Sequence, residues 1–407
     1  MSENWRAWFR QTLVQQHGGP RSGRMRIAKP FVVLWIGAFL LWISFYMASA
    51  VLPLYARSGG ASDIEVGIIV GVLTLVSAAA APLGGSMADR FGRRHVMLCG
   101  AIAFTLCAAG YAWSALVIPL VAFRALHGVG MGLYTSANSA AAADLGPAES
   151  RGARIGLMGA TVNLGLAIAP MLGLALAQSG HFDSVFAISV ALAAIAVVLM
   201  STVGETLGDR GAQVARSWGF SRKAVFPALV GLCLMAPFGV QFAFVPLYAG
   251  AEGLGAGVFF AAMALVIATV RMIGGWLSDR IGRALVTAGG LGFAGAGLLV
   301  LAFVPGLVGL AVAGLLYGIG FGVGHPALMA WSVDGSSGRE YGKALGTYLA
   351  AHQLGFALGS MAGGAVITAL GYRAAFVGAA VLVLAAVLPV LRRHVQDQRF
   401  ATARGDG

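Results

Sequence analysis

The apolar positions of this sequence run in long unbroken stretches, separated by short polar and basic connections. Windows of about 19 residues show twelve stretches that can each cross roughly 30 Å of hydrocarbon at a helical rise of about 1.5 Å per residue. Within a bilayer each stretch must satisfy its own backbone hydrogen bonds, which favours helices. The predicted spans lie near residues 30–56, 64–86, 96–115, 117–143, 153–179, 182–203, 223–249, 254–277, 285–304, 307–332, 342–370 and 373–391. We therefore expect an all-α integral membrane protein with twelve transmembrane helices.

The composition excludes a soluble globular protein. The chain has 407 residues, of which 58% are hydrophobic and only 10% are charged, whereas a soluble domain carries roughly 25% charged residues. The 60 glycines follow no collagen period and indicate close helix packing. Cys99, Cys107 and Cys233 lie singly inside apolar runs, which predicts neither a disulfide framework nor a metal site.

No motif for cofactor chemistry is present in the sequence. It contains no P-loop, zinc-ligand spacing, haem motif or nucleophile elbow. We therefore expect no cofactor, no bound metal, no ATP-driven transport and no enzymatic activity.

The basic residues predict how the chain crosses the membrane. With the N-terminus inside, six basic residues before the first span, thirteen in the connections and four in the tail place 23 of the 27 Lys and Arg residues in the cytoplasm. Arg57 and Arg373 remain outside, and Arg124 and Arg271 fall inside spans. We expect a multi-pass protein of the inner (plasma) membrane with both termini cytoplasmic. The net charge of +12 forms no patch interleaved with aromatic residues, so no nucleic-acid partner is expected.

The N-terminal segment carries its own pattern. It has no cleavage site typical of a secretory signal, so the first span is expected to stay in the mature protein. Trp5, Trp8, Phe9 and Leu13 alternate with basic residues, which is compatible with a short helix lying on an anionic inner leaflet or with disorder.

An internal repeat relates the two halves of the sequence. A shift of 190 positions aligns GGSMADRFGR at 84–93 with GGWLSDRIGR at 274–283, and HGVGMG at 127–132 with YGIGFG at 317–322. The same shift pairs Asp144 with Asp334 and Asn163 with Gln353. Repeats in parallel orientation are typical of transporters built from two bundles.

We therefore divide the chain into five parts. They are a cytoplasmic N-terminal segment (1–28), a six-helix bundle (29–203), a cytoplasmic loop between the bundles (204–221), a second six-helix bundle (222–392) and a cytoplasmic tail (393–407).

Three motifs resemble the major facilitator superfamily over residues 30 to 392. The sequence from Gly85 through Arg94, with its copy at 275–283, is similar to that family's loop between helices 2 and 3. Arg124-Ala-Leu-His127-Gly128-Val-Gly130 is similar to its helix 4 pattern. Gly165-x-x-x-Ala169-Pro170-x-x-Gly173 resembles its antiporter pattern in helix 5, with Ala in place of the second Gly. The resemblance implies two pseudo-symmetric six-helix bundles and, through the helix 5 pattern, proton-driven export of drugs or small molecules.

The charged loop of each half is a candidate conformational latch. A carboxylate next to arginines at a helix end can form charge-assisted hydrogen bonds that hold one state closed and break in the other. The alternative is that the arginines only fix the topology. The candidate latch residues are Gly85, Asp89, Arg90, Gly92 and Arg93 in the first half, and Asp279, Arg280 and Arg283 in the second.

Arg124 is the main candidate for a functional charge inside the membrane. An arginine at that depth costs several kcal/mol unless it faces protein or water, so it requires a partner. All fifteen acidic residues fall at helix ends, loops or tails, and the first span has no acid. This departs from the family's exporters, which often carry a carboxylate in helix 1 or 4. The remaining proton-coupling candidates are His127, His325 and His352, because imidazole titrates near neutral pH, with Asp63 and Glu65 as further possibilities.

The small residues of helix 5 permit another helix to approach closely. Gly165, Ala169 and Gly173 recur at a spacing of four, and Pro170 frees a backbone carbonyl. One interpretation is a functional bend at the bundle interface that favours an exporter's cycle. Ordinary small-residue packing is the alternative.

The substrate cavity is expected between the bundles, near the middle of the membrane. Its candidate residues are Trp42, Tyr46, Thr135, Asn138, Asn163, Phe238, Gln241, His325 and Gln353. Aromatic stripes of this kind can equally be packed or face lipid. The set has no anionic patch, which favours neutral, amphipathic or anionic cargo.

These observations favour a monomeric secondary active transporter whose partners are a small-molecule substrate, protons and the lipid bilayer. Proton-coupled efflux of a drug-like or metabolite substrate by alternating access is the main hypothesis. The alternatives are a proton-coupled uptake symporter on the same scaffold and a membrane receptor or scaffold that transports nothing.

Overall fold

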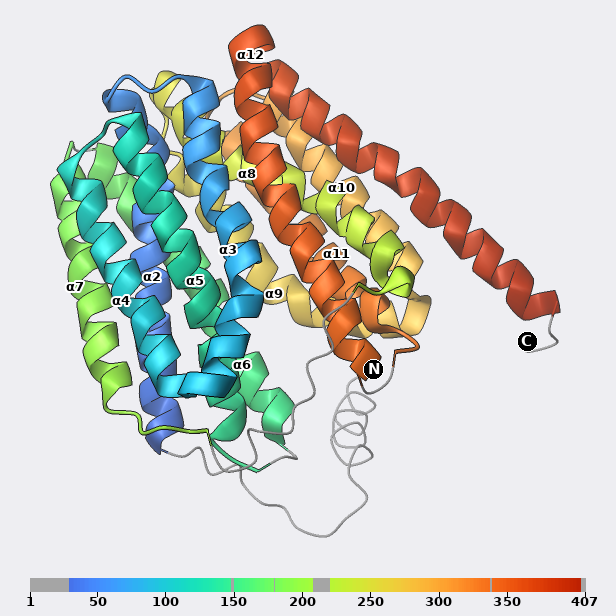
Figure 1. Ribbon diagram of the computed structural model, residues 1–407. Helices are drawn as coiled ribbons and strands as arrows, with labels where there is room; N and C mark the ends of the chain where they lie inside the picture. Colours follow the sequence, from blue (N-terminus) through green and yellow to red (C-terminus); the bar gives the residue numbers. More distant parts are fainter. Residues whose placement is uncertain (1–28, 148–149, 179, 208–219, 337–338, 404–407) are drawn as a thin grey trace, which may run out of the picture.

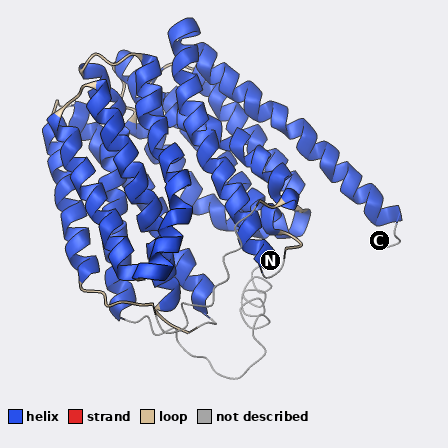
Figure 2. Cartoon of the chain, in the orientation of Figure 1, coloured by secondary structure: helices blue, strands red, loops and turns tan. Residues whose placement is uncertain are grey.

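The computed structural model describes residues 29–147, 150–178, 180–207, 220–336 and 339–403. Within these ranges the chain consists of helices and short connections, without strands (Figure 2). The helix suggested for the N-terminal segment lies outside the described residues. The elements in chain order are α2 (Lys29–Ser58), α3 (Asp63–Phe91), α4 (Arg93–Trp113), α5 (Val117–Asp144), α6 (Arg151–Gln178), α7 (Phe182–Ser201), η3 (Arg222–Ala224), α8 (Val225–Ala251), α9 (Gly257–Ile281), α10 (Arg283–Phe303), α11 (Gly306–Val333) and α12 (Arg339–Ala403).

Two of these helices contain a break. In α12 the backbone leaves the helical region at Gly371, where φ is 81°, so this helix carries two spans. In α9 the parts Gly257–Arg271 and Ile273–Ile281 meet at an angle of 50°. Ten helices of the described residues, with α12 counted once and α9 left out, are long and apolar enough to cross a membrane. With α9 as one bent span and α12 as two, the described residues hold twelve spans, which confirms the predicted fold.

The helices pack as two groups (Figure 1). In the first bundle (α2–α7), α2 packs on α6 and α7, and α5 packs on α3 and α4. In the second bundle (α8–α12), α12 packs on α8 and α10, and α11 packs on α9 and α10. The bundles meet mainly where α3 contacts α12 and where α6 contacts α9.

The two ends of the molecule are named here by the orientation of Figure 1. The upper face carries the connections at 59–62, 114–116 and 252–256 together with Gly371. The lower face carries Gly92, Gly282 and the connections that follow α5, α7 and α11. The N-terminal end of α2 and both arginine-rich loops lie at the lower face, the side for which the sequence predicts the cytoplasm.

Local sequence explains how the helices begin and end. Ser62 caps α3 in a capping box, in which its side chain accepts from the Glu65 N–H and Glu65 accepts from the Ser62 N–H. Gly92 and Gly282 have φ values of 97° and 96°, a region that favours glycine. Each of these glycines ends one helix and starts the next, which holds the two loops of the repeat in the same shape.

Candidate functional site

Arg124 is buried inside the first bundle, with 2% of its surface exposed. Its Nε donates to the Ile69 carbonyl at 3.0 Å, Nη2 donates to the Val70 carbonyl at 3.2 Å, and Nη1 donates to the Ser49 Oγ at 3.0 Å. The expected partner of this guanidinium is thus a set of neutral oxygens from α3 and α2. The side chain ties three helices together at mid-membrane depth.

His127 lies one turn further along α5 and faces α4. Its Nδ1 shares a hydrogen bond of 2.7 Å with the Tyr111 hydroxyl, and its ring lies 4.2 Å from the Phe104 ring centroid. Its Nε2 is buried without a hydrogen-bond partner. The imidazole therefore sits in an aromatic pocket within the first bundle and offers one uncommitted nitrogen.

The small residues of α6 face α2. A Cβ added at Gly165 would lie 2.9 Å from the Trp42 Cβ, and one added at Gly173 would lie 2.7 Å from the Met47 carbonyl oxygen. Ala169 and Pro170 are also buried on this face. The seam consequently packs two helices of the same bundle, as the packing interpretation requires, while another part of α6 contacts α9 of the second bundle.

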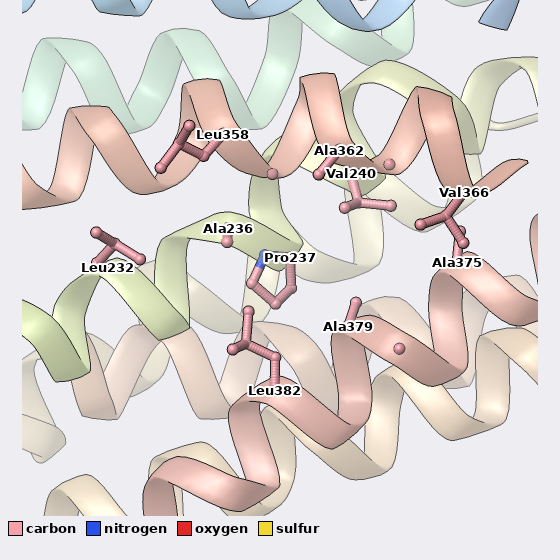
Figure 3. Close-up of a pocket in the computed structure, with 13 residues that line it drawn as sticks. Leu232, Ala236, Pro237, Val240, Leu358, Ala362, Val366, Ala375, Ala379 and Leu382 are labelled. Carbon is pink, nitrogen blue, oxygen red and sulfur yellow. The ribbon is translucent and has the colours of Figure 1, made fainter. Parts of the chain in front are cut away.

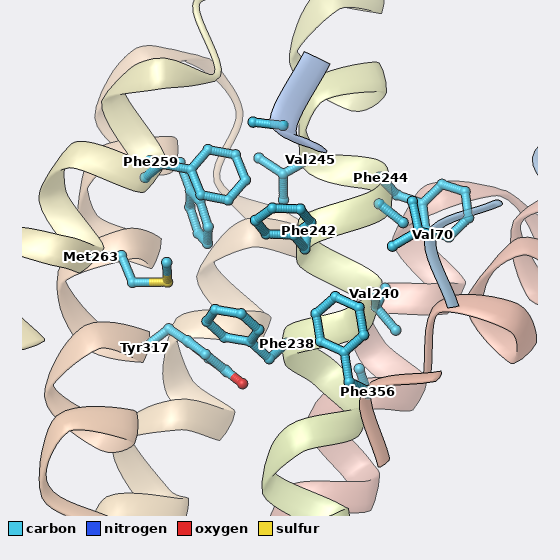
Figure 4. Packing of buried hydrophobic residues seen from close by; sticks show 14 of the residues in the cluster. Val70, Phe238, Val240, Phe242, Phe244, Val245, Phe259, Met263, Tyr317 and Phe356 are labelled. Atoms are coloured by element: carbon cyan, nitrogen blue, oxygen red, sulfur yellow. The ribbon is translucent and has the colours of Figure 1, made fainter. Parts of the chain in front are cut away.

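Aromatic residues line the contact between α2 and α8. Trp42 stacks on Tyr46 at 5.7 Å, and Tyr46 meets Phe242 of the second bundle edge to face at 6.5 Å. Phe238 lies 5.1 Å from the Phe321 ring and 6.0 Å from the Phe356 ring, and Figure 4 shows Phe238 with Phe356. Trp42 and Phe238 are buried in the present conformation, and Tyr46 is half-buried.

The polar candidates divide into buried and accessible ones. Gln241 is buried with neither amide atom hydrogen-bonded, and the Asn138 carbonyl oxygen is buried without a partner. Thr135 donates to the Met131 carbonyl of its own helix at 2.8 Å. Gln353 is half-buried on α12.

A second polar group joins the bundles. Arg271 of α9 donates from Nη1 to the Asn163 Oδ1 of α6 at 3.4 Å. His325 of α11 and His352 of α12 lie beside each other, with ring centroids 4.8 Å apart. Sequence reasoning singled out Arg271 as an intramembrane charge and His325 as a cavity residue. The fold places Arg271 at the contact between the bundles and His325 inside the second bundle.

The first charged loop is closed by pairs within its own bundle. Arg93 Nη1 bonds the Asp89 carboxylate, and Arg93 Nε donates to Asp144 Oδ2 at 3.2 Å. The Arg90 guanidinium lies over the Phe91 ring at 5.3 Å. Gly92 makes the turn between α3 and α4, whereas Gly85 lies within α3 and a Cβ there would meet nothing within 4 Å. Gly85 therefore has open space beside it in this conformation.

Glu205, which follows α7, completes this loop. Its carboxylate accepts the backbone N–H groups of Arg93 at 2.9 Å and Arg94 at 3.2 Å, at the start of α4. Burial raises the pKa of Glu205, but these bonds and those from the N–H groups of Leu207 and Thr206 lower it to below its usual value. Glu205 thus caps α4 and ties it to the end of α7.

The second charged loop repeats the arrangement of the first. Arg283 bonds Asp279 at 2.5 Å and Asp334 at 3.1 Å, and the Arg280 guanidinium lies over the Trp276 ring at 4.4 Å. We call Asp89–Arg93–Asp144 and Asp279–Arg283–Asp334 the two charge triads.

Sequence reasoning missed Arg154, which it counted among the loop arginines. This side chain is buried and donates to the carbonyls of Ala142, Ala143, Gly146 and Pro147 and to the Ser150 hydroxyl. It caps the C-terminal end of α5, where backbone carbonyls lack helical partners. The signal that could have found it is its place one turn into a helix that follows a short connection.

The bundles approach each other closely towards the upper face. A Cβ at Gly71 of α3 would lie 2.6 Å from the Ser360 Oγ of α12. Gly250 of α8 lies beside Leu54 of α2, and Gly257 of α9 lies beside Met171 of α6, each with 3.6 Å from the ideal Cβ to the nearest atom. These contacts join the bundles in the upper half of the interface, next to a cavity of about 430 Å³ that both bundles line.

The structure also holds an apolar cavity of about 360 Å³ within the second bundle (Figure 3). It is lined by α8 and both halves of α12, including Pro237, Val240, Leu358 and Leu382. Its lining contains none of the predicted substrate residues.

Comparison with known proteins identifies the family. The sequence profile of the Major Facilitator Superfamily matches residues 34–308 and 228–406. The Multi-drug resistance efflux pump PmrA homolog of Lactococcus lactis subsp. lactis (strain IL1403) is 27% identical over 376 residues, which cover 88% of this chain and 92% of that protein. Quinolone resistance protein NorA of Staphylococcus aureus (strain Mu50 / ATCC 700699) is 26% identical over 157 residues, 38% of this chain and 39% of NorA.

A solved structure has the same fold. The crystal structure of a POT family transporter in complex with 5-aminolevulinic acid superimposes with a TM-score of 0.77 at 16% identity, and covers 91% of this chain and 97% of that one. At this identity the likeness concerns the fold alone. With the profile matching most of its length and its twelve spans packed in two bundles, the chain belongs to the Major Facilitator Superfamily and is a multi-pass membrane transporter rather than an enzyme.

Proposed function

We propose that this transporter exports a small organic molecule across the inner membrane in exchange for protons. The names of the PmrA homolog and of NorA, an efflux pump and a quinolone resistance protein, support this direction. We propose that the pathway lies between the bundles of one chain, which favours a monomer. The distribution of basic residues supports cytoplasmic termini.

The observation that carries the proposal is the one-sided contact between the bundles. The close approaches at Gly71, Gly250 and Gly257 join the bundles in the upper half, whereas each charge triad at the lower face closes within its own bundle. With the lower face in the cytoplasm, this is the conformation in which an exporter takes up cargo from inside the cell. Rocking about the central contacts would then expose the same site to the outside.

We propose that the two charge triads act as the latch. In the present state Asp89 and Asp279 are held by arginines of their own bundles, so neither triad joins the bundles. Closing the lower face would bring the loops together, and charge-assisted bonds across the interface would hold it closed.

For the proton we propose a route through imidazole, because the spans have no central carboxylate. His127 has an uncommitted Nε2 next to the cationic Arg124, one helical turn away. A proton on His127 would lie beside that cation, so its uptake and loss can respond to the movement of α5.

The decisive experiment measures transport in cells that lack their own multidrug exporters. Expression of the protein should lower the accumulation of a fluorescent quinolone, and an uncoupler should restore it. The matched control is the variant Arg124→Ala, which should be expressed yet leave accumulation high. Accumulation that rises on expression would instead indicate uptake. Reconstituted vesicles that bind the quinolone but never move it under an imposed pH gradient would indicate a receptor.

A further inference from the structure

Arg271 is a mid-membrane cation whose charge the protein leaves largely uncompensated. It lies 14 residues from the start of α9 and 10 from its end, roughly 15 Å from the nearer end at helical rise. The sequence places no acidic residue near the middle of any span, so no carboxylate can neutralise it there. A charge at this depth is costly unless it faces water or a partner.

The contrast with Arg124 shows that Arg271 is not simply a second structural arginine. Arg124 is 2% exposed and makes three hydrogen bonds of 3.0 to 3.2 Å. Arg271 is half-buried, and its single hydrogen bond, to the Asn163 amide oxygen, is long at 3.4 Å. A guanidinium has five N–H donors in a planar fork that suits a carboxylate. Most of these donors remain available in Arg271.

Two imidazoles with uncommitted nitrogens lie in the electrostatic range of Arg271. Its charge acts on both His325 and His352, whose ring centroids are 4.8 Å apart. His325 Nδ1 and His352 Nε2 are buried without a partner. Buried polar atoms without partners are uncommon and require an explanation. Each neutral imidazole carries one N–H donor, so the pair can supply donors to a bound acceptor.

Arg271 and Asn163 meet across the interface between the bundles, and the two histidines lie beside each other within the second bundle. Asn163 comes from α6 of the first bundle, while Arg271, His325 and His352 come from α9, α11 and α12 of the second. A ligand bound here would touch both halves of the transporter. An anionic oxygen would also be a stronger acceptor for Arg271 than the distant amide of Asn163.

We propose that Arg271, with His325 and His352, forms a binding subsite for the carboxylate of an organic anion. The cargo class is then an amphipathic carboxylic acid, whose charged group meets Arg271 and whose apolar part lies along the aromatic residues of α2 and α8. This deepens the proposed function by naming the substrate class of its central site, and it rests on that site being the cargo site.

The test is equilibrium binding to purified protein in nanodiscs of phosphatidylcholine, a lipid without net charge. The probes are benzoate, 2-naphthoate and anthracene-9-carboxylate, each compared with its neutral amide. We expect at least one carboxylate to bind ten or more times more tightly than its amide. Arg271→Gln should abolish this preference and leave amide binding unchanged, and Arg271→Lys should retain part of it. The matched control is Arg392→Gln, which removes an exposed arginine of α12 and should bind like wild type.

Three results would overturn the subsite. One is that no carboxylate is preferred over its amide by the wild type. Another is that Arg271→Gln keeps the full preference while eluting as a monodisperse folded protein. The third concerns lipid. It has three parts: phosphatidylglycerol nanodiscs weaken carboxylate binding to wild type, Arg271→Gln shows no preference for carboxylate over amide in either lipid, and the lipid headgroup binds more tightly than every probe. This result would assign the site to a lipid headgroup.

Failure of the subsite and failure of export can be told apart. Equilibrium binding does not depend on the direction of transport or on its coupling to protons. Selective carboxylate binding without export in cells would therefore contradict only the proposed function. Proton-driven export that Arg271→Gln leaves intact for every cargo tested, together with equal binding of acid and amide, would contradict only the subsite.

Discussion

Two arginines inside membrane-spanning helices have opposite surroundings. Arg124 donates to two carbonyls of α3 and one hydroxyl of α2, so its charge is dispersed over neutral oxygens in a sealed interior. The forked guanidinium is essential to this arrangement, because its donors reach three acceptors on two different helices, α3 and α2. A lysine has the same charge but only one nitrogen on a flexible stem.

We therefore predict that Arg124→Lys destabilises the first bundle despite keeping the charge. A hydrogen bond to a charged group contributes about 1.5–3 kcal/mol, and at least one would be lost. The thermal midpoint of purified protein should fall by several degrees, and transport should fall with it. Arg57→Lys, which keeps its exposed pair with Asp63, is the control. A midpoint for Arg124→Lys equal to that of the control would contradict this account.

Glycines of α6 provide a second prediction at the scale of single residues. Gly173→Ala places a methyl group 2.7 Å from the Met47 carbonyl oxygen, and the overpacking should cost about 1–3 kcal/mol. Gly159→Ala on the same helix meets nothing within 4 Å and should be neutral or slightly stabilising. Thermal unfolding of the two variants in the same detergent makes the comparison, and equal midpoints would show that the seam between α6 and α2 tolerates more volume than the structure indicates.

At the scale of elements, the two charge triads are alike in connectivity and different in exposure. The Asp89 side chain is 30% exposed, and that of Asp279 is 68% exposed. Exposed ion pairs contribute little, because water screens them. The first triad is therefore the stronger candidate for a latch.

We predict that Asp89→Asn lowers the transport rate by roughly two- to tenfold, from the loss of one charge-assisted bond at a partly exposed site, while expression is maintained. Asp279→Asn should have a smaller effect. Initial rates in vesicles containing matched amounts of each variant test this. A larger loss for Asp279→Asn, or an unchanged rate for Asp89→Asn, would reject the latch.

The hydrogen bonds of Glu205 to the start of α4 predict that the stability of the protein depends on pH. Its pKa is lowered in the folded protein, so its contribution to stability is complete above the unfolded carboxyl pKa of about 4.3 and is lost as the pH falls through the folded value. The thermal midpoint of wild type should exceed that of Glu205→Gln at neutral pH, and the difference should shrink on acidification below about pH 4.3. Glu340→Gln, at an exposed acid of the same face, should show no such trend. A difference that grows on acidification would have the wrong sign.

The sequence predicted the elements well and their partners only partly. Spans are encoded by long apolar runs, so the predicted spans 64–86 and 96–115 correspond to α3 (Asp63–Phe91) and α4 (Arg93–Trp113) within a few residues. The repeat paired Asp144 with Asp334, yet their roles emerged only when α5 and α11 placed them against Arg93 and Arg283. The partners of Arg124 are backbone carbonyls, which every residue has and no sequence pattern marks. Sequence reasoning missed Arg154 for the same reason, because its partners are mostly backbone carbonyls.

For the whole molecule, the contacts near the upper face predict a way to stop the cycle. In a variant whose natural cysteines are replaced, Leu54→Cys with Gly250→Cys joins two helices whose side chains are in contact across the bundles. A short thiol crosslinker should react readily with this pair, arrest transport and release it on reduction. The control pair, Gly85→Cys with Gly275→Cys, lies at equivalent positions where a Cβ meets nothing within 4 Å. Rapid crosslinking of the control pair with none at the upper pair would show that the resting protein opens towards the other side.

The hydrogen bonds of Glu205 to the start of α4 also distinguish the first half of the repeat from the second. Glu205 fastens the beginning of α4 to the chain after α7, whereas the 190-residue shift places Val395 at the corresponding position of the second half. A valine side chain cannot accept these hydrogen bonds. We expect the first half to behave as a stiff frame, while the second half, with its bent α9 and the Gly371 break in α12, provides most of the deformation. On this account the two copies of the duplicated unit differ in rigidity: the first half stays fixed during the cycle, and the second half changes shape.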